Sequence, residues 1–161
     1  MNKGEIIKAV LDELKRQRSE LESGLASAKQ TALEAPGAMQ SHSDTTKSQM
    51  HALAANIEKM IREKDIAIKY LNDFLNSSSN KNKTVKEGAL IEIQDENNAK
   101  KFYLLVPDGG AGVIVKVGDV SVTSLTARTP LGSALTGKKS GDTVTLRNKT
   151  GDRNLKILNV Y

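Results

Sequence analysis

Two stretches decide the fold: IIKAVLDELKRQRSELESGLASAKQTALEA at residues 6–35 and MHALAANIEKMIREKDIAIKYLNDFL at residues 50–75. In both, residues recur at alternating steps of four and three, which keeps them on one face of a helix. The first series is Ile7, Leu11, Leu14, Arg18, Leu21, Leu25, Ala28 and Ala32. The second series is Met50, Ala54, Ile57, Ile61, Lys64, Ile68, Leu71 and Leu75. The spacing predicts two long helices, each with one mainly apolar seam.

The two series match each other when the helices run antiparallel, because the residue numbers of every facing pair add up to 82. The two polar members, Arg18 and Lys64, also face each other, so both seams are interrupted at the same layer. We therefore predict one antiparallel helical hairpin over residues 6–75, with its end near Ser41. At ~1.5 Å per residue each arm is roughly 35–40 Å long, so we expect the hairpin to project into solvent or into a partner.

The predicted tip, residues 36–47, is polar and rich in Ser and Thr. Pro36 and Gly37 stop the first helix, because Pro disfavours helical backbone in the residue before it and Gly permits a turn. Ser43 or Asp44 is the expected N-cap of the second helix, since a short side-chain oxygen accepts backbone N–H groups there. Alanines fill the last seam layers. They either make the tip slim enough for a narrow opening or simply let two helices approach before a turn.

The period of the sequence changes after residue 83. Residues 77–83 form a polar, non-periodic run that we interpret as a linker between a hairpin domain at 1–76 and a second domain at 84–161. Short apolar runs separated by turns predict strands at 89–94, 101–106, 113–117, 120–125, 143–147 and 155–160, and a short helix at 130–135. The predicted class is α+β: a long antiparallel coiled-coil hairpin followed by a mostly antiparallel sheet packed on a short helix.

Composition narrows the possible classes of protein. The 161 residues include no Cys, which excludes disulfides and thiolate metal sites and fits a reducing cytosol. No apolar stretch approaches the roughly 20 residues of a membrane span, so we expect a soluble, cytoplasmic protein with no membrane partner. We also expect a monomer, because pairing within the hairpin already uses the apolar seam. The net charge of +5 lies entirely in residues 81–161. A basic surface there indicates an acidic or nucleic-acid partner, or ordinary solubilising charge.

The run Pro130-Leu-Gly-Ser-Ala-Leu-Thr-Gly-Lys-Lys-Ser-Gly-Asp-Thr-Val144 resembles the C-terminal signature of the Gre family of bacterial transcript cleavage and elongation factors. Thr129 stands where that signature has Ser. Val85-x-x-Gly88-Ala-Leu-Ile and Tyr103-Leu-Leu-Val-Pro resemble two further segments of the same domain. The resemblance implies an FKBP-like fold for residues 84–161, following a coiled-coil hairpin.

The resemblance also implies a mechanism. Gre factors dock their globular domain on RNA polymerase beside its secondary channel and insert the hairpin, so that tip carboxylates lie near the catalytic Mg²⁺ of the polymerase. There the carboxylates help to hold a second metal ion and the water that cleaves backtracked RNA. By this resemblance the protein is not an enzyme and has no cofactor of its own. The resemblance implies that it at most stimulates cleavage by RNA polymerase, that its tip shares the Mg²⁺ of that enzyme, and that it lies close to the nascent RNA.

The tip departs from the family pattern, which has two acids three residues apart followed by an aromatic. Asp44 is the only acid in residues 41–49, and Lys47 follows it. Glu34 on the opposite arm is the candidate second carboxylate, which makes Asp44 and Glu34 the expected catalytic pair. The alternative is a regulator or inhibitor that occupies the channel without promoting cleavage. The other tip residues expected in the channel are Ser41, Ser43, Thr45, Thr46 and Lys47.

Three other features of the sequence resemble binding sites, and each has a simpler structural interpretation. Four basic residues are close in the predicted register and either face RNA or, with interleaved acids, form a solvated, salt-bridged surface: Arg16, Arg18, Arg62 and Lys64. His42 and His51 are nine residues apart without Cys, so no zinc site is expected. The Gly-rich segment 108–112 lacks the ending of a phosphate-binding loop and predicts a turn. A structural adaptor remains the rival function, although pairing within the hairpin already uses its apolar seam.

Overall fold

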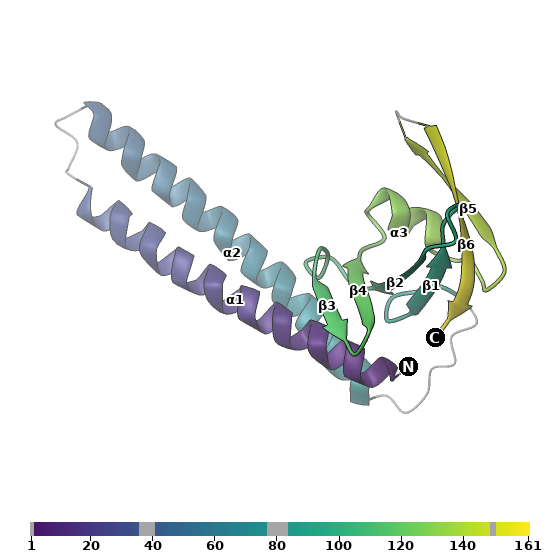
Figure 1. The fold of residues 1–161 in the computed structure, drawn as a ribbon. Coiled ribbons are helices and arrows are strands. Elements are labelled where there is room, and N and C mark those ends of the chain that lie inside the picture. Colours follow the sequence, from purple (N-terminus) through teal and green to yellow (C-terminus); the bar gives the residue numbers. More distant parts are fainter. Residues whose placement is uncertain (1, 36–40, 77–83, 149–150) are drawn as a thin grey trace.

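The computed structural model describes residues 2–35, 41–76, 84–148 and 151–161, with side chains in the second range described from Thr46 onward. Two long antiparallel helices extend from a sheet that carries a short helix (Figure 1). In chain order the elements are α1 (Lys3–Glu34), α2 (Ser41–Asn76), β1 (Leu90–Gln94), β2 (Lys100–Leu105), β3 (Ile114–Val117), β4 (Val120–Leu125), α3 (Pro130–Leu135), β5 (Thr143–Asn148) and β6 (Gly151–Val160). The predicted α+β class is confirmed.

The helical hairpin has the predicted register. Lys64 Nζ donates a hydrogen bond to Gln17 Oε1 at 2.8 Å, and Arg18 bonds to Asp65 across the same layer. Both contacts lie within one residue of the pairing in which Arg18 faces Lys64. The polar interruption of the two seams is therefore one shared layer of the hairpin.

Local sequence explains where the helices begin and end. The Asn2 side chain caps α1 by accepting a hydrogen bond from Gly4 N at 3.0 Å. Ala35 is extended, as expected for a residue that precedes proline. α2 ends at Asn76, and the predicted linker at 77–83 lies outside the described residues. None of the helices in the described ranges is both long enough and apolar enough to cross a membrane.

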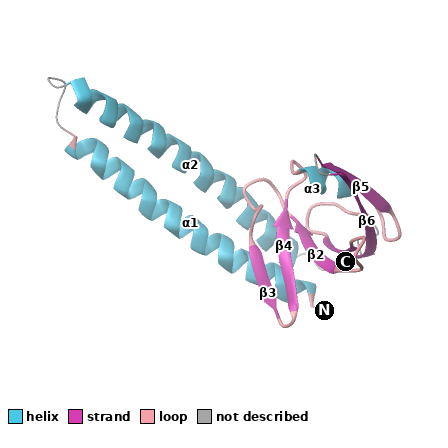
Figure 2. Cartoon of the chain, turned by 45° about the horizontal axis from the view of Figure 1, so that its top comes forward, coloured by secondary structure: helices cyan, strands magenta, loops and turns pink. Residues whose placement is uncertain are grey.

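The base of the hairpin packs on one face of the sheet, where β3 lies beside α1 (Figure 2). Buried side chains from both helices and from the sheet form one apolar cluster there. Its members are Ile6, Ile7, Val10, Leu11, Leu14, Ala67, Leu71, Leu90, Leu104, Val106, Val113, Val115 and Val122. Ile6 and Val10 are adjacent to the seam series in sequence, so the apolar stripe of α1 is wide enough to contact both α2 and the sheet.

The sheet has the strand order β3-β4-β2-β1-β6-β5. Neighbouring strands are antiparallel except β2 and β4, which run parallel. The chain leaves β2, forms the edge strand β3 and turns back through Gly118, whose φ of 60° favours glycine. β4 then inserts between β3 and β2, so the expectation of a mostly antiparallel sheet holds with one parallel pair.

The second face of the sheet packs around α3. Thr129 caps this helix, because its hydroxyl accepts a hydrogen bond from Gly132 N at 3.0 Å and donates one to Thr126 O at 2.8 Å. A Cβ on Gly132 would lie 2.0 Å from Thr126 O, so no larger residue fits there. The signature run around residues 129–144 therefore contains residues that build this end of the domain, far along the chain from the hairpin tip.

Candidate functional site

The end of the hairpin is the first candidate site. α1 ends at Glu34 and α2 begins at Ser41, so the connection is shorter than the predicted tip at 36–47. Ser43 and Asp44 lie inside the first turn of α2, and the prediction that either is its N-cap is wrong. The physical reason is that no Pro or Gly occurs between Gly37 and α2, so helical backbone extends further toward the turn than expected.

The described side chains of the tip leave the predicted carboxylate pair untested. Glu34 is exposed on the last turn of α1, where its carboxylate accepts a hydrogen bond from Gln30. Thr46 and Lys47 are exposed on α2. The carboxylate of Asp44 lies outside the described side chains, as do the side chains of Ser41, Ser43 and Thr45. Convergence of Glu34 and Asp44 therefore stays a prediction.

Small side chains bring the two helices together near this end. Ala28, Ala32 and Ala54 are almost fully buried in the outer seam layers, as the sequence predicts. Leu33 lies off the seam and is 79% exposed. A hollow of about 390 Å³ lies beside these layers and is lined by Lys29, Leu33, His51, Ala54, Ala55 and Glu58. The described part of the outer hairpin is thus slim, with an apolar side chain on its surface.

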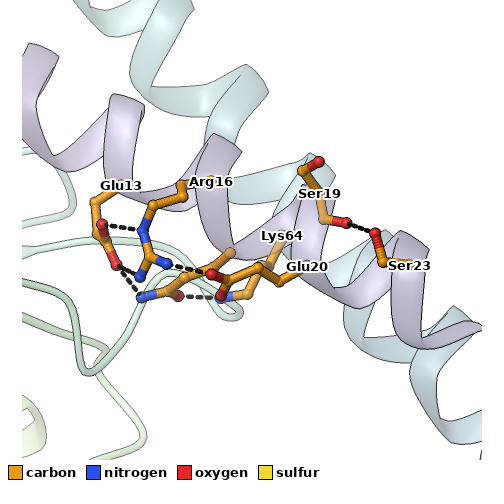
Figure 3. Close-up of polar contacts among 7 residues, drawn as sticks. Glu13, Arg16, Ser19, Glu20, Ser23 and Lys64 are labelled. Atoms are coloured by element: carbon orange, nitrogen blue, oxygen red, sulfur yellow. Dashed lines mark hydrogen bonds and ion pairs between the residues drawn. The ribbon is translucent and has the colours of Figure 1, made fainter.

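A network of charged and amide side chains crosses the middle of the hairpin (Figure 3). Arg16 Nη2 lies 2.7 Å from Glu13 Oε1, and Arg16 also pairs with Glu20. Gln17 Nε2 donates a hydrogen bond to Glu13 at 2.9 Å, while its oxygen accepts the bond from Lys64. We call this set, together with Arg18 and Asp65, the polar belt.

The polar belt uses most of the predicted basic patch. Arg18 pairs with Asp65 on α2 and with Glu22 on its own helix, the latter at 2.8 Å. Arg62 is exposed on α2. Three of the four candidate RNA-facing residues thus have acidic or amide partners within the hairpin, which favours the salt-bridged interpretation. A contact with RNA stays a prediction.

The contacts of the belt shift several pKa values. Hydrogen bonds from Arg16 and Gln17 lower the pKa of Glu13 to about 2. The hydrogen bond and charge of Asp65 raise the pKa of Arg18. Burial lowers the pKa of Lys64, whose Nζ also donates a hydrogen bond to a backbone carbonyl of the β2–β3 loop. Glu13 therefore remains a carboxylate over the whole physiological pH range, and Arg18 remains a guanidinium.

The described residues do not by themselves form a metal site. Within the ranges that the structure describes, no group of three or more His, Cys, Asp or Glu side chains is placed to hold an ion. His51 lines the hollow with one acidic residue, Glu58, and the side chain of His42 is outside the described set. Glu34, hydrogen-bonded to Gln30, would supply at most one oxygen donor group to a metal held mainly by another molecule.

One contact was not anticipated from the sequence. The Gly-rich segment 108–112 is a turn, as predicted, with Gly110 N donating to Pro107 O at 3.1 Å. Gly109 also lies directly against α2, and its carbonyl accepts a hydrogen bond from Lys64 Nζ at 3.3 Å. The available signal was the presence of three glycines in five residues, more than a single turn requires.

Comparison with known proteins identifies the family. Residues 80–161 match the model of the family "Transcription elongation factor, GreA/GreB, C-term". The transcription elongation factor GreA of Streptococcus pneumoniae is 35% identical over 107 residues, covering 66% of this chain and 62% of that protein. GreA of Acidiphilium cryptum is 44% identical over 78 residues, covering 48% and 45%. The chain thus spans about half to three fifths of the length of these curated relatives.

The chain also aligns with solved structures at low sequence identity. The GreA factor homolog 1 (Gfh1) of Thermus thermophilus covers 96% of both chains at 19% identity, with a TM-score of 0.39. Gfh1 of Thermus aquaticus covers 96% of this chain and 95% of its own at 19% identity, with a TM-score of 0.41. The family assignment rests on the sequence match, which includes half of the chain. The protein belongs to the GreA/GreB family of transcription elongation factors.

Proposed function

We propose that this protein binds RNA polymerase and inserts its helical hairpin into the secondary channel, where the tip modulates elongation. The observation that carries the proposal is the free outer half of the hairpin. The sheet packs against the base, as far out as Glu63 on α2. Beyond the polar belt, residues 21–34 of α1 extend by ~20 Å. A projection of this length is the part of the molecule best suited to enter a partner.

The packing of the outer hairpin supports insertion into a narrow space. Its seam is closed within the chain by alanine layers, so the two helices need no partner to bury it. Ion pairs across the helices, including Lys29 Nζ to Glu58 Oε1 at 2.8 Å, add to the seam. Such self-pairing favours a hairpin that enters a partner as one unit. In the rival structural adaptor, the seam would instead bind another protein.

In one form of the proposal, the tip stimulates cleavage of backtracked RNA by the polymerase. Asp44 and Glu34 are the residues that would supply carboxylate oxygens, the ligand type that Mg²⁺ prefers. The polymerase would supply the metal and the catalytic machinery. The contribution of this chain is placement of acidic oxygen atoms near the RNA, and the protein itself carries out no reaction.

The composition of the tip favours a second form, in which the hairpin occupies the channel without promoting cleavage. Residues 41–49 contain one acid, Asp44, and one cation, Lys47. A lysine near the carboxylate weakens the local attraction for a divalent cation. The factor would then slow or redirect nucleotide addition by its presence in the channel.

A cleavage assay on backtracked elongation complexes separates the two forms. The proteins to compare are the wild type, Asp44→Asn, Glu34→Gln, and the control Asp119→Asn, which changes an exposed acid on the β3–β4 turn. RNA shortening that is lost in Asp44→Asn and kept in the control supports the cleavage form. Slower nucleotide addition by the wild type, without RNA shortening, supports the occupying form. A protein that neither binds the polymerase nor changes either rate contradicts the proposed function.

A further inference from the structure

The loop between β2 and β3, residues 107–113, is held in place by the strand behind it. The Ser124 hydroxyl is completely buried, donates a hydrogen bond to Gly110 O at 2.6 Å and accepts one from Val113 N at 2.9 Å. Gly112 N donates to Ser124 O at 3.0 Å. An ion pair of 2.8 Å joins Asp108 to Arg128 on the outer side. The loop is therefore fixed to the sheet at several points, and we call it the brace loop.

The brace loop meets α2 without an intervening side chain. A Cβ on Gly109 would lie 2.3 Å from the carbonyl carbon and oxygen of Glu63, so the loop touches the backbone of the helix. A Cβ on Gly110 would lie 3.2 Å from the Cβ of Ala67, one turn further along α2. Because both contacts involve atoms that have no rotamer freedom, this part of the joint has little room to adjust.

Lys64 connects the brace loop at Gly109 to both helices. Its Nζ donates hydrogen bonds to Gly109 O at 3.3 Å and to Gln17 Oε1 at 2.8 Å. One amine thus connects the brace loop, α2 and α1. Lys64 is the polar member of the α2 seam, which gives this interruption of the apolar pattern a structural role.

A second contact lies at the other end of the joint. A Cβ on Gly88 would lie 2.4 Å from the ring of Phe74, and the Tyr70 hydroxyl donates to Glu87 O at 3.0 Å. Glu63 and Phe74 are separated by eleven residues of α2, or ~16 Å along its axis. Two contacts this far apart determine a direction as well as a position.

We propose that the brace loop sets the direction of the hairpin relative to the sheet, with Gly109 as the positioning residue and Lys64 as the tie. From Glu63 to Ser41, α2 is ~33 Å long, so a tilt of ~10° at the brace displaces the tip by ~6 Å. The effect of the brace on the orientation of the hairpin in the free protein does not depend on the proposed function. Only the consequence for polymerase rests on the proposed function, because a displaced tip would reach a different point in the channel.

Distance measurement in the free protein tests the brace directly. The chain has no cysteine, so spin labels can be attached to cysteines introduced at Leu53 on the outer hairpin and Lys156 on β6, both exposed. Gly109→Ala is compared with Gly112→Ala in this labelled background. Both glycines have positive φ, 87° and 79°, but only a Cβ at Gly109 would meet α2, since nothing lies within 4 Å at Gly112. Backbone strain is therefore matched and the steric contact differs.

We expect Gly109→Ala to shift the interlabel distance by several ångström or to broaden its distribution, while Gly112→Ala leaves the distribution as in the parent protein. Lys64→Met keeps the glycines and removes the tie, and we expect it to broaden the distribution. It serves as the second variant if Gly109→Ala does not fold. A parent-like distribution in every folded variant, or an equal change in Gly112→Ala, overturns the proposal.

An elongation assay with the same variants separates the brace from the proposed function. If both hold, Gly109→Ala loses most of the effect on polymerase and Gly112→Ala keeps it. A changed distance in Gly109→Ala, together with a wild type that has no effect on polymerase, would support the brace and contradict the function. An unchanged distance in Gly109→Ala, together with a wild type that does act on polymerase, would contradict the brace and support the function.

Discussion

The base and the outer half of the hairpin share one heptad pattern but are stabilised differently. At the base, Ile7, Leu14 and Leu71 are at most 1% exposed. The two helices cover part of each of these side chains, and the sheet covers the rest. In the outer half, Leu25 and Ile57 are only partly buried, because the helices cover each other and nothing else. The same repeat thus forms part of a globular core at one end and a self-contained probe at the other.

This difference predicts a gradient of rigidity along the hairpin. The base loses its packing only when the sheet separates from it, whereas the outer layers can open by local separation of two helices. Local opening requires less free energy where fewer apolar contacts are buried. We therefore expect amide exchange in α1 to be slow at the base and faster toward Glu34.

The largest contrast should come from truncating one leucine at each end. Leu71→Ala removes a fully buried side chain that contacts both the helices and the sheet, and should cost about 2–5 kcal/mol of unfolding free energy. Leu25→Ala removes a partly buried side chain, and should cost less than about 2 kcal/mol. Chemical denaturation followed by circular dichroism measures both values. Equal losses would show that the base and the outer half are equally packed.

A smaller contrast is expected from enlarging one alanine at each end. Ala67 is fully buried beside Gly110 of the brace loop, so Ala67→Leu should destabilise by about 1–3 kcal/mol through overpacking. Ala54 lies in an outer layer next to the hollow, where the helices can move apart, so Ala54→Leu should cost less. Thermal unfolding midpoints of the two variants compare them. A larger loss for Ala54→Leu would contradict the two-region account.

The polar belt lies between the two regions and should add little stability. A double-mutant cycle with Arg18→Ala and Asp65→Ala should give a coupling energy of about 0.2–1 kcal/mol, because both side chains are partly exposed. The coupling should fall in high salt, which screens exposed charges. A coupling of several kcal/mol that is insensitive to salt would assign the belt a role equal to that of the apolar base.

The smallest expected effect is a pH dependence at Glu13. Its pKa is lowered to about 2 in the folded protein by hydrogen bonds from Arg16 and Gln17, against an ordinary value of 4.5. The unfolded chain therefore takes up the proton first, and the stabilisation present above pH 4.5 is lost as the pH falls toward 2.

Stability curves of the wild type and Glu13→Gln over this range measure the effect, with Asp12→Asn as a control on an exposed neighbouring carboxylate. The difference between wild type and Glu13→Gln should shrink as the pH falls from 4.5. A difference that is constant with pH would mean that the Glu13 contacts do not depend on its charge.

The hairpin was predictable from the sequence because the residues that pair its two helices recur at a regular spacing. The register was predicted by placing Arg18 opposite Lys64. The hydrogen bonds from Arg18 to Asp65 and from Lys64 to Gln17 confirm it. Strand positions followed from short apolar runs between turns, except that β6 begins at Gly151, four residues before the predicted start. The parallel pairing of β2 and β4 could not be predicted in the same way. It depends on which strand inserts between two others, and no local sequence pattern encodes that order.

The candidate site was less predictable than the fold. Ser43 and Asp44 were expected at the helix start, but helix boundaries depend on competition between a cap and continued helical backbone, and here the helix extends further. The contact of Gly109 with Glu63 joins residues that are distant in sequence. A glycine that meets another backbone and a glycine that merely turns the chain are identical in sequence, as Gly109 and Gly112 illustrate.

Site-specific photocrosslinking tests the central claim, that the outer half of the hairpin enters RNA polymerase. A photoreactive amino acid at Lys47, exposed near the tip, is compared with one at Asp119 on the β3–β4 turn, in elongation complexes that carry labelled RNA. The account predicts crosslinks from position 47 to the catalytic subunits or the RNA 3′ end, and none to the RNA from position 119. Binding of the factor without any crosslink from position 47 to the interior of the polymerase would contradict it.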